Sequence, residues 1–185
     1  MRLDPWNVDE FLRFLVAVSP ATLKAYEQDL NEFIRWSEKS GSAAPEVITR
    51  NDVDGWIADM QNNGNAQKTM ARRISALRRY FQWLMSKKVI EKDPTAKVRT
   101  PKGPQRLPRP LQRSEIDQLF DESTPQNALE LRDRLVVELL YGSGLRVAEL
   151  CGLQEENLNL KNQTIEVIGK GSKIRTIPIT AYACD

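Results

Sequence analysis

Prolines divide this chain into two parts. Five of its ten prolines fall between Asp93 and Pro110, a stretch that no helix or strand can cross intact, because proline lacks a backbone N–H and fixes φ. Before this stretch the apolar residues recur with a helical period, and after it helical patterns give way to alternating ones. We therefore expect a helical domain over residues 1–90, a proline-rich linker over 91–110 and an α+β domain over 111–185.

Four helices are predicted in the first domain. Ser19-Pro20 combines an N-cap with a proline at the first helical position, and Ser40-Gly41-Ser42 ends the helix that they open. A later helix is expected to begin through Asn51 or Asp52. The helices are predicted to span residues 7–18, 20–39, 49–60 and 65–85.

Basic residues gather in the fourth helix and the linker. Between Lys68 and Arg113 stand fourteen Lys or Arg and two acids, a net +12 in a chain of net charge +2, so the rest carries −10. A solvated surface usually mixes its signs, whereas a block of one sign favours a polyanion such as nucleic acid. The alternative is a linker that is basic only for solubility.

The fourth helix is predicted to have two unlike faces. One carries an apolar stripe typical of a core-facing helix: Met70, Ile74, Leu77, Phe81 and Leu84. At about 100° per residue, cations and hydroxyls fall on the opposite face: Lys68, Arg72, Ser75, Arg79 and Ser86. Such a helix can lie along double-stranded DNA with most contacts to phosphates. An ordinary amphipathic helix is the alternative, although it more often interleaves acids. In the linker, Lys102 and Arg106 are further candidates for DNA contact.

The second domain is predicted to hold three helices and a hairpin. A capped helix runs from Leu111 through Phe120, and a long buried helix over 127–141 places Leu131, Leu135, Val136 and Leu139 in the core. A short helix over 146–153 follows. Residues 164–168 and 174–179 alternate as two strands, which alone make a sheet of marginal stability.

An arginine and two turn lysines are the candidate functional residues of this domain. Arg146 follows the break at Gly142-Ser143-Gly144, where a helix N-terminus beside an arginine requires an anion to offset the unfavourable dipole. Lys170 and Lys173 occupy the glycine-containing turn between the strands. Together they suit an enzyme that handles a phosphate. The alternative for the lysines is to protect a sheet edge from pairing.

Ordered motifs over nearly the whole chain resemble those of the tyrosine recombinases, especially the Xer-type resolvases and the phage integrases. The motifs of the first domain and the linker are Ser19-x-x-Thr22-x-x-x-Tyr26-x-x-Asp29-Leu30-x-x-Phe33-x-x-Trp36, Ser75-Ala76-Leu77-Arg78-x-x-Phe81-x-Trp83-Leu84, Asp93-Pro94, Pro101-Lys102 and Leu107-Pro108. Those of the second domain are Leu131-Arg132-Asp133, Gly144-Leu145-Arg146-Val147-Ala148-Glu149-Leu150 and Gly169-Lys170-Gly171-Ser172-Lys173-Ile174-Arg175. The resemblance implies a helical, SAM-like core-binding domain followed by the first part of an α+β catalytic domain.

The resemblance also implies site-specific DNA recombination through a phosphotyrosyl intermediate, with no metal and no cofactor. Arg146 matches the family's first catalytic arginine, and Lys170 matches the lysine that protonates the leaving oxygen, ahead of Lys173. Glu149 matches a supporting acidic position, although it also suits a solvent-facing partner of Arg146. Family members act as tetramers on DNA, so duplex DNA is the expected partner.

The chain departs from the family pattern in its second half. It has no histidine, hence no His-x-x-Arg motif, and its last residue is Asp185. Tyr182 lies far short of the family's nucleophile position, so no nucleophile is assigned. We expect a truncated recombinase that binds DNA without cleaving it. The alternatives are a non-catalytic DNA-binding module and a relic of a recombinase gene.

Composition adds an expected location. Cys151 and Cys184 have no metal-ligand spacing, which favours free thiols in a reducing cytosol. No stretch approaches the roughly 18–20 apolar residues of a membrane span. We expect a cytoplasmic protein with no membrane partner.

Overall fold

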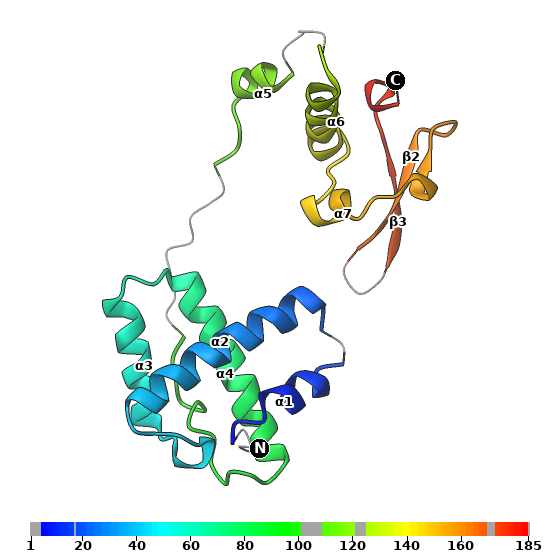
Figure 1. Cartoon of the computed structure of the whole chain (residues 1–185). Helices are drawn as coiled ribbons and strands as arrows, with labels where there is room; N and C mark the ends of the chain where they lie inside the picture. The colour runs from blue at the N-terminus through cyan, green and yellow to red at the C-terminus, as the bar shows by residue number, and fades with distance from the viewer. Residues whose placement is uncertain (1–4, 17, 101–108, 121–124, 170–172, 185) are drawn as a thin grey trace. The chain divides into compact units, whose positions relative to one another are not determined.

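The chain forms two compact units, Met1–Arg106 and Leu107–Asp185, each described by itself (Figure 1). The computed structural model describes residues 5–16, 18–100, 109–120, 125–169 and 173–184. The first unit is helical and the second combines helices with a small antiparallel sheet. The predicted fold class, a helical domain followed by a partial α+β domain, is confirmed.

Four α-helices are formed by the described residues of the first unit. They are α1 (Val8–Phe14), α2 (Pro20–Lys39), α3 (Arg50–Asn62) and α4 (Gln67–Ser86), with a 3-10 turn at Pro45–Val47 before α3. Helix α2 packs against each of the other three (Figure 1). The helices are therefore held as one bundle around a shared apolar core.

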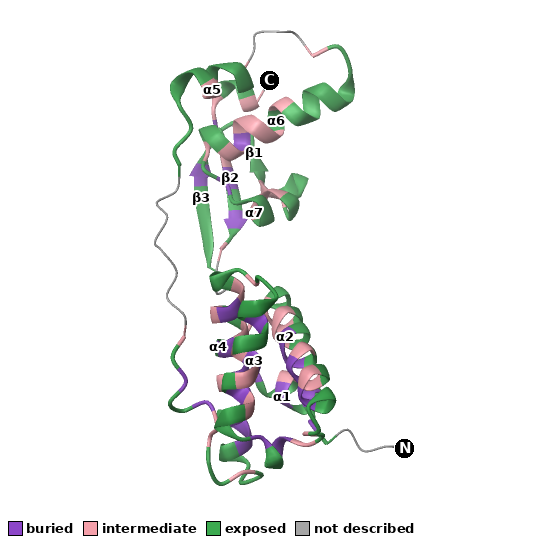
Figure 2. Cartoon of the chain, turned by 90° about the vertical axis from the view of Figure 1, so that its left-hand side faces the viewer, coloured by how far each residue is buried: buried purple, intermediate pink, exposed green. Residues whose placement is uncertain are grey.

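Helix α4 contributes most of that core, as its period predicted. Its five stripe residues, from Met70 to Leu84, are each at most 1% exposed, and Tyr80 and Trp83 are buried beside them. Figure 2 shows buried segments along the length of α4. The Tyr80 hydroxyl donates a hydrogen bond of 2.6 Å to the buried main-chain carbonyl of Trp6. This bond fastens the N-terminal segment to α4.

In the first unit the starts of α2 and α3 follow capping rules, and the start of α3 corrects a prediction. Ser19 caps α2, with its Oγ accepting from the Thr22 amide at 3.4 Å, as predicted. The prediction that α3 begins through Asn51 or Asp52 is wrong, because Thr49 is the N-cap. The Asp52 carboxylate accepts from the Thr49 amide at 2.8 Å, which completes a capping box.

Helix α1 is shorter than predicted. It ends at Phe14, and Leu15 leaves the helical conformation with φ −82° and ψ 58°. That change of direction places the Leu15 side chain in the core, where it is 3% exposed. The expected extension to Val18 is therefore wrong, because the amides of Leu15 and Val16 donate to the carbonyls of Leu12 and Phe14 instead of to those four residues back.

The start of the proline-rich stretch packs on the first unit. The Asp93 carboxylate accepts from both the amide and the hydroxyl of Thr95, at 2.7 and 2.6 Å, and Thr95 is fully buried. Arg78 of α4 donates to the Val98 carbonyl at 3.0 Å. Residues 93–98 are thus fixed to α4 although they form neither helix nor strand.

The second unit contains α5 (Arg113–Leu119), α6 (Ala128–Gly142) and α7 (Val147–Cys151), followed by the sheet. Strands β1 (Leu158–Asn159), β2 (Thr164–Ile168) and β3 (Ile174–Pro178) form an antiparallel sheet in the order β1-β2-β3. The expectation of a two-stranded hairpin is therefore wrong, because β1 adds an edge through pairing of Leu158 with Ile165. A turn with Gln163 at φ 51° makes this return possible.

The prediction that α6 is a buried helix is also wrong for the described residues. Of its predicted core residues only Leu139 is buried, while Leu131 and Leu135 are 59% and 40% exposed. Leu139 packs in a small core with residues of the sheet and its flanks: Leu145, Ile165, Val167, Ile177 and Ile179. Only the C-terminal part of α6 reaches this core, which leaves its earlier turns exposed (Figure 2).

Candidate nucleic-acid interface

The exposed face of α4 carries the predicted cations. Lys68, Arg72, Ser75 and Arg79 are all exposed, on the side away from the buried stripe. Lys68 and Arg79 form no ion pair with any described residue. Ser75 donates its hydroxyl hydrogen to the Ala71 carbonyl at 2.8 Å, so in this conformation it has no hydrogen to donate to another acceptor.

Two predicted DNA-contact residues of the linker, Lys102 and Arg106, lie outside the described residues, as does Lys170 of the hairpin turn. The structure therefore places the α4 members of the predicted set and leaves those three as predictions.

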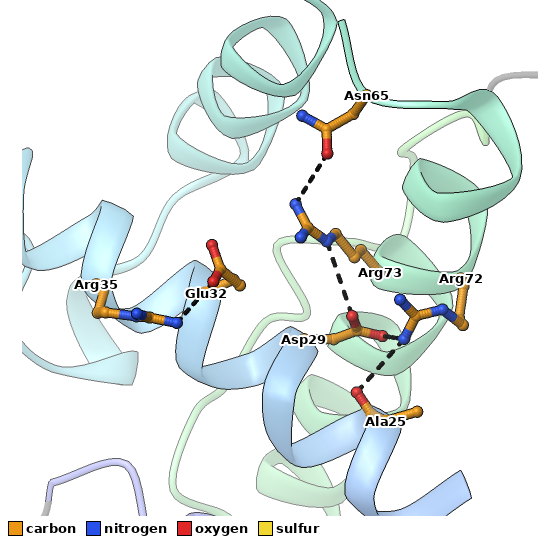
Figure 3. Close-up of polar contacts among 7 residues, drawn as sticks. All are labelled: Ala25, Asp29, Glu32, Arg35, Asn65, Arg72 and Arg73. Carbon is orange, nitrogen blue, oxygen red and sulfur yellow. Dashed lines mark hydrogen bonds and ion pairs between the residues drawn. The ribbon is translucent and has the colours of Figure 1, made fainter. Parts of the chain in front are cut away.

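A buried carboxylate lies beneath the α4 cations. Asp29 of α2 is 3% exposed and forms an ion pair with Arg72 (Figure 3). Arg72 also donates from the same Nη1 to the Ala25 carbonyl at 3.5 Å. Arg73 lies on the other carboxylate oxygen, with its Nε at 3.7 Å, and donates to the Asn65 Oδ1 at 3.3 Å. Two arginines of α4 thus share one anion supplied by α2.

Burial raises the pKa of the Asp29 carboxyl above its ordinary value, and the charges of Arg72 and Arg73 oppose that rise. Asp29 was not among the residues that the sequence singled out for function. A signal was present, because Asp29 stands three residues after Tyr26 and four before Phe33, on the apolar face of α2. A carboxylate on a core-facing stripe requires a cation, and α4 supplies two.

The second unit holds another cluster of two arginines and one acid. The Glu149 carboxylate accepts from the Arg146 amide and from its guanidinium, both at 2.8 Å, and from the Arg175 guanidinium at 2.9 Å. The Glu149 side chain is 5% exposed, whereas that of Arg146 is 69% exposed. The alternative of a solvent-facing Glu149 is therefore wrong.

A left-handed glycine places Arg146 in this cluster. Gly144, with φ +62°, ends α6, and the Leu145 amide turns back to the Leu139 carbonyl at 3.4 Å. This geometry is that of a helix C-terminus closed by glycine. Leu145 is buried, so Arg146 emerges as the residue before α7. The anion that an arginine at this position requires is Glu149.

The pKa of the Glu149 carboxyl is lowered, chiefly by the hydrogen bond from the Arg146 amide and further by the side chains of Arg146 and Arg175. Partial burial opposes this effect. The cluster is therefore two guanidinium cations held by one ionised carboxylate, with a net positive charge.

Arg175 stands at the end of the motif over residues 169–175, but no functional role was assigned to it from the sequence. Its position in β3 pairs with Val167 of β2, and Ile165 pairs with Ile177. Paired positions share a face of the sheet, so Arg175 lies on the face of the buried Val167 and Ile177 rather than on the outer one. The alternation of side chains along β3 puts Arg175 on the same face as Ile177. Whether that face is the buried one is known only from the register of β3 against β2.

The hairpin end lies next to Glu149. A side-chain carbon placed on Gly169 would lie 3.9 Å from the Glu149 Oε1, and the Gly169 amide donates to the Lys173 carbonyl at 2.7 Å. The Lys173 side chain is exposed. Arg146, Glu149 and Arg175 thus meet beside Gly169 and the end of the hairpin at which Lys173 lies.

Tyr182, to which no role was assigned, is 78% exposed. Cys151 and Cys184 are free thiols, as expected, and Cys184 packs against the core of the second unit. Among the described residues no group of three or more side chains is suited to hold a metal ion. Every helix in the described part of the chain is too short or too polar to cross a lipid bilayer.

Two family models match the chain. Residues 8–88 match the phage integrase N-terminal SAM-like domain, and residues 109–185 match the phage integrase family. Tyrosine recombinase XerD of Listeria innocua is 38% identical over 176 residues, which cover 93% of this chain and 59% of the relative. Tyrosine recombinase XerC of Halalkalibacterium halodurans is 35% identical over 185 residues, or 98% and 61%. The chain therefore spans about three-fifths of the length of these curated relatives.

Solved structures share the fold. The Tn1549 transposon integrase in complex with a circular intermediate DNA has a TM-score of 0.73 at 19% identity, covering 96% of this chain and 61% of its own. A lambda integrase dimer bound to a COC′ core site has a TM-score of 0.71 at 22% identity, with coverages of 94% and 47%. At these identities the likeness extends to the fold alone.

Proposed function

The chain belongs to the phage integrase family of tyrosine recombinases, and on that premise we propose that it is the DNA-binding part, and part of the catalytic site, of a site-specific DNA recombinase. Its partner is duplex DNA, on which the whole protein acts as a tetramer in the cytoplasm. The reaction is strand cleavage and rejoining through a phosphotyrosyl intermediate. Within the chain, α4 and the linker bind DNA. The cluster of Arg146, Glu149 and Arg175, here called the Arg146 cluster, binds the phosphate that reacts.

The observation that carries the proposal is the exposed basic face of α4. Lys68 and Arg79 have no ion-pair partner among the described residues, on a helix fixed by a buried aromatic and aliphatic stripe. A cation without an ion-pair partner in the protein gives up no such interaction when it contacts a phosphate. The release of counterions from DNA then supplies binding free energy. The rigid helix keeps both cations on one side.

The Arg146 cluster supports the catalytic part of the proposal. Strand cleavage at a phosphate places negative charge on the non-bridging oxygens, which a guanidinium stabilises by forked hydrogen bonds. The Glu149 carboxylate accepts from the Nη1 of Arg146, and most of the Arg146 side chain remains exposed. Arg146 is thereby pre-oriented, and the second arginine keeps the cluster cationic. In this proposal Lys170, ahead of Lys173, protonates the leaving oxygen, and Glu149 positions Arg146.

A salt series on a random-sequence duplex tests the binding proposal. Each phosphate contact contributes about −0.9 to the slope of log affinity against log salt concentration. The double variant Lys68→Ala/Arg79→Ala is expected to make this negative slope shallower by about 2. Lys39→Ala/Lys161→Ala is the matched control, because it removes the same charge from exposed positions outside α4. It is expected to leave the slope nearly unchanged.

Equal slope changes in the two double variants would contradict an α4 interface. The same titrations with a nicked duplex check the chain for a covalent adduct. We expect none from this chain, because no residue in it is assigned as the nucleophile.

A further inference from the structure

The cations on the α4 face differ in how they are held. Lys68 and Arg79 extend from the helix with no ion pair to the described residues, so their side chains keep their rotamer freedom. Arg72 is fixed at one end, where its Nη1 meets both the Asp29 carboxylate and the Ala25 carbonyl (Figure 3). The face therefore combines two cations with free side-chain rotamers and one arginine whose orientation is fixed.

The contacts of Arg72 leave one edge of its guanidinium available. A guanidinium has five N–H donors, two of them on Nη1, and both acceptors from α2 lie at that nitrogen. No described residue accepts from Nε or Nη2, and the side chain is 46% exposed. The Nε–Nη2 edge presents two parallel donors, the arrangement that binds a pair of acceptors at once.

The support beneath Arg72 is itself fixed. Asp29 is buried, and its second oxygen faces Arg73, whose side chain is 20% exposed and hydrogen-bonded to Asn65 (Figure 3). The network joins α2, α4 and the segment before α4. The entropy of ordering Arg72 is thus lost on folding rather than on binding, and this pre-organisation favours a ligand with strict geometry.

The charge around Arg72 favours a DNA base over a phosphate as the ligand of its free edge. Asp29 offsets the charge of Arg72, which weakens its attraction to an anionic phosphate but leaves its hydrogen-bond geometry intact. A neutral base edge does not need the full positive charge. Guanine presents O6 and N7 side by side in the major groove, and arginine is its commonest bidentate partner.

We propose that Arg72 is a base-reading residue that recognises guanine, and that Asp29 is the positioning residue that directs it. Lys68 and Arg79 supply phosphate contacts without sequence preference. This inference rests on the proposed binding of duplex DNA, and it adds a specificity-determining residue to that function.

Selection of binding sites from a randomised duplex library tests the proposal. The wild-type chain is expected to enrich guanine at one or more positions, and replacing that guanine is expected to weaken binding about ten-fold or more. Arg72→Lys keeps the charge and removes the fork, so the guanine preference at that position should disappear. Arg79→Lys makes the same chemical change at an exposed arginine without a buried partner and should leave every preference in place.

Asp29→Asn separates positioning from folding. We expect it to reduce the guanine preference while affinity for random duplex stays the same or rises, because an anion beneath the interface is removed. A loss of structure would instead lower both, and tryptophan fluorescence reports the fold of this unit, since all four tryptophans lie within it. If Asp29→Asn does not fold, Arg72→Lys still decides the question because that side chain is exposed.

The outcomes are distinct. An unchanged guanine preference in Arg72→Lys, or wild-type binding with no base preference, overturns the role of Arg72 and leaves the proposed DNA binding in place. Absence of binding to any duplex at low salt overturns the proposed function and this inference together.

Discussion

Arg175 of β3 donates a hydrogen bond of 2.9 Å to Glu149 of α7, across 26 positions of the chain. The bond ties the hairpin to the helix that Arg146 precedes. Without it, Glu149 would be held by Arg146 alone. The position of Arg146 thus depends on a strand that lies well after it in the sequence.

Removal of Arg175 should change the titration of Glu149. In Arg175→Ala the pKa of the Glu149 carboxyl is expected to rise toward its ordinary value, because two of the interactions that lower it come from Arg175. Titration by NMR of the carboxyl carbon measures this. Arg132→Ala is the control, since Arg132 pairs with its neighbour Asp133 and lies outside the cluster. A Glu149 pKa unmoved by Arg175→Ala would mean that Arg146, through its amide and its side chain, is what lowers it.

The lowered pKa of Glu149 also predicts an acid-sensitive second unit. The ionised carboxylate stabilises the fold above the ordinary glutamate pKa, and this contribution is lost as the pH falls through the lowered pKa. Glu149→Gln should reduce stability at neutral pH and remove this part of the acid dependence. Hydrogen exchange of the buried Ile165 and Val167 amides across the pH range provides the measurement. A wild-type acid dependence preserved in Glu149→Gln would assign it to another group.

Asp29 predicts the opposite dependence of stability on pH in the first unit. Because its folded-state pKa is raised, the folded state binds the proton more tightly than the unfolded chain does. Its contribution is therefore fully present below the ordinary aspartate pKa and declines as the pH rises through the raised value. Asp29→Asn should flatten this decline in urea titrations followed by tryptophan fluorescence. If wild-type stability instead rises over that window, Arg72 and Arg73 outweigh burial.

The sequence predicted what depends on local periodicity and missed what depends on partners. The 20 residues of α4 contain enough repeats to define both faces, so its core stripe followed from period alone. The two residues of β1 are too few to show alternation. Leu131 and Leu135 have apolar side chains, but apolarity does not say whether a neighbouring element covers them. Arg175 required the strand register, which pairs it with Val167.

The hydroxyl of Tyr80 is expected to contribute measurably to the free energy of unfolding of the first unit. Its hydrogen bond to the Trp6 carbonyl is buried and joins positions 74 residues apart. Tyr80→Phe keeps the ring contacts and removes this donor, which should destabilise the first unit by about 1 kcal/mol. Urea unfolding followed by tryptophan fluorescence provides the value. Phe81→Tyr is an informative comparison: it adds a hydroxyl at a fully buried ring and should cost at least as much. A Tyr80→Phe variant as stable as wild type would show that this hydrogen bond does not contribute to anchoring Trp6.

Helix α6 offers a test of the small core in the second unit. Leu139 is 5% exposed among sheet residues, so Leu139→Ala should cost about 2–5 kcal/mol by lost burial and cavity formation. Leu131→Gln, at a side chain that is 59% exposed, should change stability by no more than about 0.5 kcal/mol. Both changes lie on one helix, about two turns apart, and introduce good helix formers, so burial is the main difference between them. Far-UV circular dichroism on heating, with the first unit followed by tryptophan fluorescence, separates the two units. A large loss in Leu131→Gln would show that the early turns of α6 are covered in solution, and would restore the buried helix that its leucine pattern predicted.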